Sequence, residues 1–137
     1  MKAVLVLCFL LFSATALDDL TFEILLTYKG QQCAVQYQLF VITEKQRRSQ
    51  QEEQWTYTGK AEKLTTSLDG NGPNNDFYEP VFEVTFFTPD TQEMKVGSLT
   101  FDHQLFKVGR NTQVGFTFDL NLLQKSNLVH PSKVVFG

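Results

Sequence analysis

The stretch FYEPVFEVTFFT, at residues 77–88, decides the fold class of this chain. Phe82, Val84 and Phe86 fall on one side of an extended backbone, and Glu83 and its alternate neighbours fall on the other. Successive side chains of a β-strand point to opposite faces, so this alternation predicts a strand with one apolar, buried face.

The same alternation recurs on both sides of this stretch. Residues 20–28 (LTFEILLTY) and 33–42 (CAVQYQLFVI) are joined by a short turn that contains Gly30. Two alternating runs joined in this way predict an antiparallel hairpin. Pro80 lacks a backbone N–H, which predicts that the strand at 77–88 lies at a sheet edge or carries a bulge near its start. The expected strands are 20–28, 33–42, 55–58, 77–88, 94–101, 112–120 and 133–136, with 60–68 either a strand or irregular.

These strand signals predict an all-β protein with six to seven strands and no helix. Strands with one polar face are typical of antiparallel sheets that meet water on one side. The fold class is therefore an antiparallel β-sandwich, with a small closed β-barrel as the alternative. Residues 43–54 (TEKQRRSQQEEQ) contain no apolar side chain and are expected to form a long polar connection.

The first 16 residues are not expected to belong to the fold. Lys2 is followed by an unbroken apolar run and then by small residues that end at Ala16. This order predicts a secretory signal peptide at 1–16, followed by a single domain at 17–137. The apolar run is shorter than the roughly 20 residues of a membrane span, so we expect no transmembrane segment and a soluble, secreted, extracellular protein.

Net charge and cysteine content limit the kinds of partner that the protein is expected to bind. The formal net charge is −3 at pH 7, which argues against nucleic acid as a partner because nucleic acid rewards dense Lys and Arg patches. Of the two cysteines, Cys8 lies in the expected signal peptide and Cys33 is left alone. Cys33 is then either a buried thiol or an interchain disulfide, and the protein is a monomer or a Cys33-linked dimer.

The sequence does not favour an enzyme. The two histidines, His103 and His130, lie in different connections, and His103 adjoins Asp102, whose side chain should point to the opposite face of an extended chain. The alternating pattern around Cys33 predicts a core position rather than a nucleophile. We expect no catalytic residues and no organic cofactor.

A calcium ion is the one cofactor for which the sequence offers ligands. The loop DGNGPNND at 69–76 carries oxygen ligands on Asp69, Asn71 and Asp76, the weak candidates for a metal site. The same residue types are ordinary turn formers, and we favour a turn without a metal.

Aromatic residues complete the candidate sites. Trp55, Tyr57 and Tyr78 flank loops, where exposed aromatics commonly bind proteins or sugars. The leading hypothesis is therefore a secreted binding module that recognises an extracellular protein or glycan through these aromatics and its loops.

The sequence leaves open where three further phenylalanines point and leaves two alternative functions. Phe40, Phe87 and Phe101 are expected either to project from the outer strand faces or to be covered by the second sheet or by loops. The alternative functions are a Ca²⁺-dependent β-sandwich that binds a membrane or matrix, and a secreted protease inhibitor.

Overall fold

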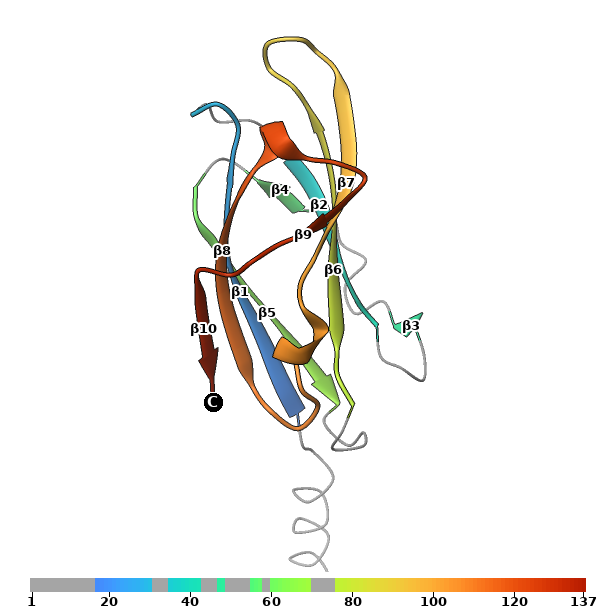
Figure 1. The fold of residues 1–137 in the computed structure, drawn as a ribbon, viewed down its shortest axis with the longest axis vertical. Coiled ribbons are helices and arrows are strands. Elements are labelled where there is room, and N and C mark those ends of the chain that lie inside the picture. The colour runs from blue at the N-terminus through green and yellow to red at the C-terminus, as the bar shows by residue number, and fades with distance from the viewer. Residues whose placement is uncertain (1–16, 31–34, 43–46, 49–54, 58–59, 70–75) are drawn as a thin grey trace, which may run out of the picture.

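Two β-sheets stacked face to face form the protein in the computed structural model (Figure 1). The predicted all-β sandwich is confirmed, and the helical turns among the described residues are two short 3₁₀ segments, η1 (His103–Leu105) and η2 (Leu120–Leu122). The alternative of a closed barrel is wrong for the described chain, because each sheet ends in strands that have a neighbour on one side only. The structure describes residues 17–30, 35–42, 47–48, 55–57, 60–69 and 76–137.

The smaller sheet has four strands in the described part of the chain, and β1 lies in its interior. β1 (Leu17–Thr27) runs antiparallel to β5 (Glu62–Asp69) on one side and parallel to β8 (Thr112–Asp119) on the other. β10 (Lys133–Phe136) pairs antiparallel with β8 and forms the opposite edge of the sheet.

Among the described residues the larger sheet has six strands, and β6 (Glu79–Phe87) lies between β2 (Val35–Ile42) and β7 (Met94–Thr100). Both neighbours of β6 run antiparallel to it, whereas β9 (Ser126–Leu128) pairs parallel with β7. The expectation of purely antiparallel pairing is thus wrong for β1–β8 and β7–β9, whose partners come from distant parts of the chain. The remaining strands are β3 (Arg47–Arg48) and β4 (Trp55–Tyr57), which both pair with β2, and β9 (Ser126–Leu128) at the other edge.

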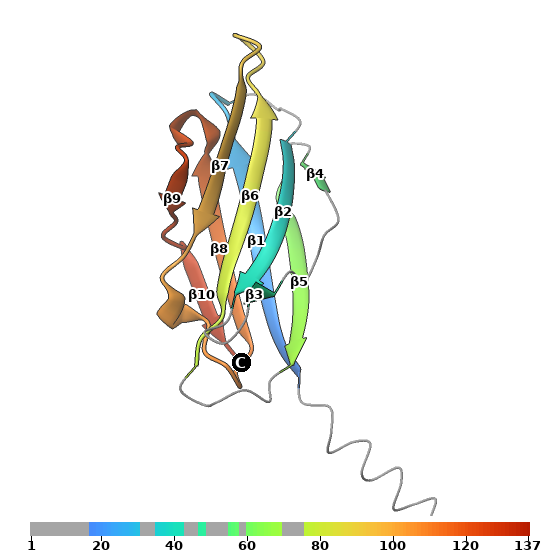
Figure 2. The ribbon, with the colours of Figure 1, turned by 90° about the vertical axis from the view of Figure 1, so that its right-hand side faces the viewer.

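The hairpin predicted from the first two strands does not form. β1 pairs with β5 and β8, and β2 pairs with β6 and the short β3 and β4, so the chain changes sheets after β1 (Figure 2). Lys29 and Gly30 both adopt positive φ, at 47° and 73°, as a tight reversal requires. A reversal of this kind can connect two strands of one sheet or carry the chain to the opposite sheet, and here the apolar faces of β1 and β2 meet across the core.

The predicted strand faces are confirmed by the burial of alternate residues. In β6, Phe82, Val84 and Phe86 are at most 2% exposed, whereas Phe87 is 60% exposed. The core is rich in aromatic rings, with Phe22 and Phe82 in an edge-to-face contact at 5.0 Å between ring centroids. Such contacts add to the stability gained by burial of the rings.

Pro80 lies in an interior strand, contrary to the edge position or bulge predicted for it. It pairs with Val41 of β2, and the pairing of β6 with β7 begins one residue later, at Val81 with Thr100. The proline is tolerated because it stands at the very start of the strand, beyond the end of the β7 ladder.

Candidate functional site

Tyr78 is not an exposed binding residue, and that part of the predicted aromatic site is wrong. Its side chain is 3% exposed, and its hydroxyl donates a 2.6 Å hydrogen bond to Oδ2 of Asp18, which is itself buried. The backbone N–H of Gly109 donates to the same oxygen at 2.7 Å. Tyr78 therefore ties the start of β1 to the segments before β6 and β8 and has a structural role.

The other two predicted aromatics lie in β4, whose backbone pairs Trp55 with Tyr37 and Tyr57 with Val35 of β2. The side chains of Trp55 and Tyr57 lie outside the described residues, as does Cys33. The binding role of these aromatics and the interchain disulfide stay predictions.

The carboxylate of Asp76 takes part in a hydrogen bond next to its own position in the chain, and its role as a metal ligand stays a prediction. Asp76 is 5% exposed, and its Oδ1 accepts a 2.8 Å hydrogen bond from the N–H of Phe77. Its backbone carbonyl accepts another hydrogen bond, at 3.0 Å, from the N–H of Val108. Asn71 and the side chain of Asp69 lie outside the described residues. Within the part of the chain that is described, no three acidic, histidine or cysteine side chains gather as a metal site would need.

The histidine considered as a base occupies an exposed position at η1. Nδ1 of His103 is 4.0 Å from Oδ1 of Asp102, and the same Oδ1 accepts the N–H of Gln104 at 3.0 Å as a helix cap. The His103 ring meets Phe77 edge to face at 5.6 Å between centroids. These contacts account for both side chains as parts of a capped turn.

The most exposed apolar surface of β6 and β7 lies at the end of their hairpin. Phe87 pairs with Met94 across the two strands, and Val96 pairs with Thr85 in the next position on the same face. Phe87 and Met94 are each 60% exposed and Val96 is 58% exposed. We call Phe87, Met94 and Val96 the hairpin patch. Among the aromatics expected to project, Phe87 does so, Phe40 is half-buried, and Phe101 is 7% exposed in the core.

The hairpin that carries this patch extends past the other strands at one end of the sandwich (Figure 1, Figure 2). Two backbone hydrogen bonds stabilise its turn. The N–H of Thr88 donates to the carbonyl of Glu93 at 2.9 Å, and the N–H of Gln92 donates to the carbonyl of Thr88 at 3.0 Å. Thr88 is 1% exposed, so the turn closes around a buried residue. The patch therefore stands on an ordered support.

A cluster at the end of β1 attaches the hairpin turn to the smaller sheet. The Lys29 ammonium lies 2.9 Å from Oδ2 of Asp90, and the Tyr28 hydroxyl donates to Oδ1 at 2.8 Å. These hydrogen bonds, from Lys29 first and then from Tyr28, lower the pKa of Asp90 to about 2. Burial raises the pKa of Tyr28, and the hydrogen bond to Asp90 raises the pKa of Lys29. All three groups therefore keep their neutral-pH protonation states over a wide range.

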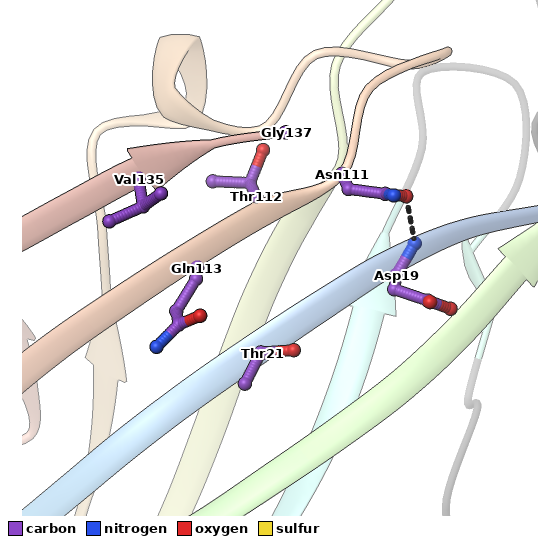
Figure 3. A pocket seen from close by; sticks show the side chains of 7 residues that line it. All are labelled: Asp19, Thr21, Asn111, Thr112, Gln113, Val135 and Gly137. Carbon is purple, nitrogen blue, oxygen red and sulfur yellow. Dashed lines mark hydrogen bonds between the residues drawn. The ribbon is translucent and has the colours of Figure 1, made fainter.

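A hollow of about 220 Å³ lies on the outer face of the smaller sheet, between β1, β8 and β10 (Figure 3). Several of its polar groups already have partners: the N–H of Asp19 donates to Oδ1 of Asn111 at 2.9 Å, and Ser67 donates to Oδ1 of Asp19 at 2.6 Å. The hydroxyl of Thr112, also in the lining, has no hydrogen-bond partner among the described groups. At the next position, Nε2 of Gln113 donates to Oε1 of Glu23 at 2.6 Å. A ligand would have to replace these bonds, so the hollow offers less to a partner than the hairpin patch does. Its lining consists of Asp19, Thr21, Asn111, Thr112, Gln113, Val135 and Gly137.

Fold and site together define a mixed β-sandwich with an apolar patch on a projecting hairpin. No protein-family model matches the chain, and neither a curated protein nor a solved structure matches it. The described residues include no helix with the length and apolar character needed to cross a membrane.

Proposed function

We propose that this protein is secreted and acts by binding another extracellular protein through the hairpin patch, without catalysis. The observation that carries the proposal is the set of three adjacent apolar side chains, Phe87, Met94 and Val96, each at least 58% exposed. Clustered apolar side chains on a projecting element are typical of protein-binding surfaces. The export signal expected at residues 1–16 supports an extracellular partner.

The composition of the patch favours a protein over a glycan. A sugar site needs polar groups that converge on hydroxyls beside an aromatic ring, whereas the neighbours of Phe87 in the patch, Met94 and Val96, are apolar. Burial of such side chains is favourable in proportion to the apolar area removed from water. The thioether of Met94 adapts to irregular partner surfaces, and methionine is enriched in protein interfaces.

The charges near the patch do not favour an anionic membrane. Glu83 and Glu93 lie on or near the hairpin together with Lys95, and Asp90 is paired with Lys29. Anionic lipid surfaces attract clusters of Lys and Arg, which the hairpin lacks in its described residues. The calcium-dependent and protease-inhibitor alternatives depend on residues 43–54 and 69–76, most of which lie outside the described residues, and both stay predictions.

The test is to locate the contact by photo-crosslinking. A photoreactive amino acid is introduced at Val96, and the protein is incubated with extracellular fluid of its source organism before irradiation and mass spectrometry. We expect a defined set of crosslinked proteins, and we expect the crosslinks to be lost when Phe87→Ser and Met94→Ser are combined. With a captured protein purified, the double variant should bind at least tenfold more weakly, since two apolar anchors are removed from the interface.

Leu128→Ser supplies the matched control. Leu128 pairs with Thr100 on the same sheet and is 58% exposed, but it lies away from the hairpin end. The control variant should keep the crosslinks and the affinity. Equal crosslinking by the double variant and the control would contradict the proposed patch.

A further inference from the structure

The edge of the smaller sheet is a second surface that could bind a partner, because the outer side of its last strand is unpaired in the described chain. β10 is the outermost strand of that sheet, and no strand of the described chain pairs with its outer side. Figure 1 shows β10 at the margin of the molecule. We propose that two copies of this chain associate through their β10 strands, antiparallel, so that two four-stranded sheets join into one continuous sheet across a twofold axis. This surface lies on the other sheet from the hairpin patch and is independent of it.

The backbone of β10 presents hydrogen-bonding groups to the open side at two residues. Val135 pairs with Gln113, and the N–H of Gly137 donates to the carbonyl of Asn111 at 3.0 Å. In an antiparallel ladder, residues that bond to the neighbouring strand alternate with residues whose N–H and C=O point away from it. Val135 and Gly137 therefore bond toward β8, and Val134 and Phe136 direct a donor and an acceptor each toward the open edge.

Two such edges are complementary to each other in one register. With Val135 on the twofold axis, Val134 of one copy lies opposite Phe136 of the second copy, and four N–H to C=O hydrogen bonds close between the chains. Lys133 then lies opposite Gly137, which has no side chain, so no like charges face each other across the pair. The edge thus fits a second copy without any change in sequence or backbone pairing.

The side chains on this edge favour the same pairing. Val134, Val135 and Phe136 are 37%, 45% and 51% exposed. The register brings Val134 beside an aromatic ring and Val135 beside its own equivalent, and both kinds of cross-strand pair stabilise sheets. The Phe136 ring is already held in place, because Cζ of Arg110 lies 3.8 Å from its centroid.

The opposite edge of the same sheet does not offer such a surface. β5 places Glu62 and Lys63 next to each other near its start, and charged side chains on an edge strand oppose pairing with another chain. β10 carries a single charge, Lys133, at its first position. Edge pairing therefore joins two molecules through β10 and stops there, as closed twofold symmetry requires.

Sedimentation velocity tests the proposal on protein expressed as the whole chain in a secretory host and purified from the medium. Reductant is present throughout, so that a disulfide through Cys33 makes no contribution. An interface of one short strand pair is small, and we expect a reversible dimer whose fraction rises between about 10 and about 500 µM. A monomer over this whole range would overturn the proposal.

Val135→Lys and Val135→Glu locate the contact. Each variant places two like charges together on the twofold axis, and we expect the dimer dissociation constant to rise at least tenfold. An equimolar mixture of the two variants should recover the dimer, because opposite charges then meet. Leu122→Lys, at a position 65% exposed on η2, is the matched control and should dimerise as the unchanged protein does.

Val134→Pro provides an independent variant that removes one outward N–H and leaves the bonds between β10 and β8 in place. It should also weaken the dimer, with an unchanged circular dichroism spectrum. A dimer that persists in Val134→Pro and in both Val135 variants would show that another surface is used and would overturn the proposal.

Discussion

The hydroxyl of Tyr78 and the carboxylate of Asp18 form a hydrogen bond of 2.6 Å in the protein interior. Asp18 is 5% exposed and stands one residue after the start of β1, and it accepts a second hydrogen bond from the N–H of Gly109 at 2.7 Å. A buried carboxylate requires such donors, because the loss of water around it is otherwise uncompensated. This pair joins segments that are distant in sequence at one end of the sandwich.

Tyr78→Phe removes one donor from this buried carboxylate without changing the ring. We expect the free energy of unfolding to fall by about 1.5–3 kcal/mol, the range for hydrogen bonds to charged groups. Urea denaturation followed by fluorescence measures the change. Tyr28→Phe is the matched comparison, because its acceptor Asp90 is far more exposed than Asp18, and its loss should be smaller. An equal loss in the two variants would contradict the structural role assigned to Asp18.

The two faces of β6 could be predicted from the sequence because the pleat of a strand depends only on local geometry. Phe86 and Phe87 are adjacent in sequence, yet one is 1% exposed and the other 60% exposed, as the alternation around them indicates. Which strands pair with each other cannot be predicted from the local sequence in this way. The parallel pairing of Leu20 with Thr112 joins residues far apart in the chain, and no local pattern specifies it.

The hairpin patch could not be predicted from the local sequence either. In residues 94–101, MKVGSLTF, apolar side chains occupy both sides of the alternation. The inward-facing side is interrupted at Gly97, which has no side chain. The sequence alone therefore does not tell that Met94 and Val96 face outward while Leu99 is buried. The burial of Tyr78 does not follow from the local sequence for a related reason, since its buried partner Asp18 lies in β1, far away in the chain.

Phe86→Ala and Phe87→Ala test the two faces of β6 directly. Phe86 contacts Tyr28 edge to face at 5.7 Å between centroids, and its truncation leaves a cavity in the core. We expect Phe86→Ala to lower the free energy of unfolding by about 3–5 kcal/mol. Phe87→Ala should change it by no more than about 0.5 kcal/mol, as is usual at exposed sites. Equal melting temperatures for the two variants would contradict the assignment of the faces.

The attachment of the hairpin turn through Asp90 should depend on pH. The pKa of Asp90 is lowered to about 2, below its ordinary value of 3.8, so its ionised form stabilises the fold. This contribution is fully present above about pH 4 and is lost as the pH falls toward 2. The melting temperature of Asp90→Asn should therefore lie below that of the unchanged protein at pH 7, and the difference should shrink between pH 4 and pH 2. A difference that stays constant down to pH 2 would contradict an ion-pair origin.

Gly97 of β7 lies where another segment of the chain approaches the strand too closely for a side chain. A Cβ atom at this position would lie 2.8 Å from Cδ1 of Leu123 and would also overlap the backbone carbonyl of Gln124. The N–H of Ser98 donates to the carbonyl of Lys125 at 3.1 Å, which holds the approaching segment against β7. Backbone atoms cannot move aside as a flexible side chain can, so the segment after η2 would have to separate from β7.

We therefore expect Gly97→Ala to lower the free energy of unfolding by about 3 kcal/mol or more, at or above the usual range for overpacked sites. Gly115→Ala is the matched control, since its Cβ would find its nearest neighbour, Cβ of Lys133, at 3.4 Å. Gly115→Ala should change the free energy of unfolding very little, because the unfolded chain has less conformational entropy to lose with alanine at this position than with glycine. Thermal unfolding of both variants measures the contrast, and a stable Gly97→Ala would mean that residues 123–125 do not pack on β7 as described.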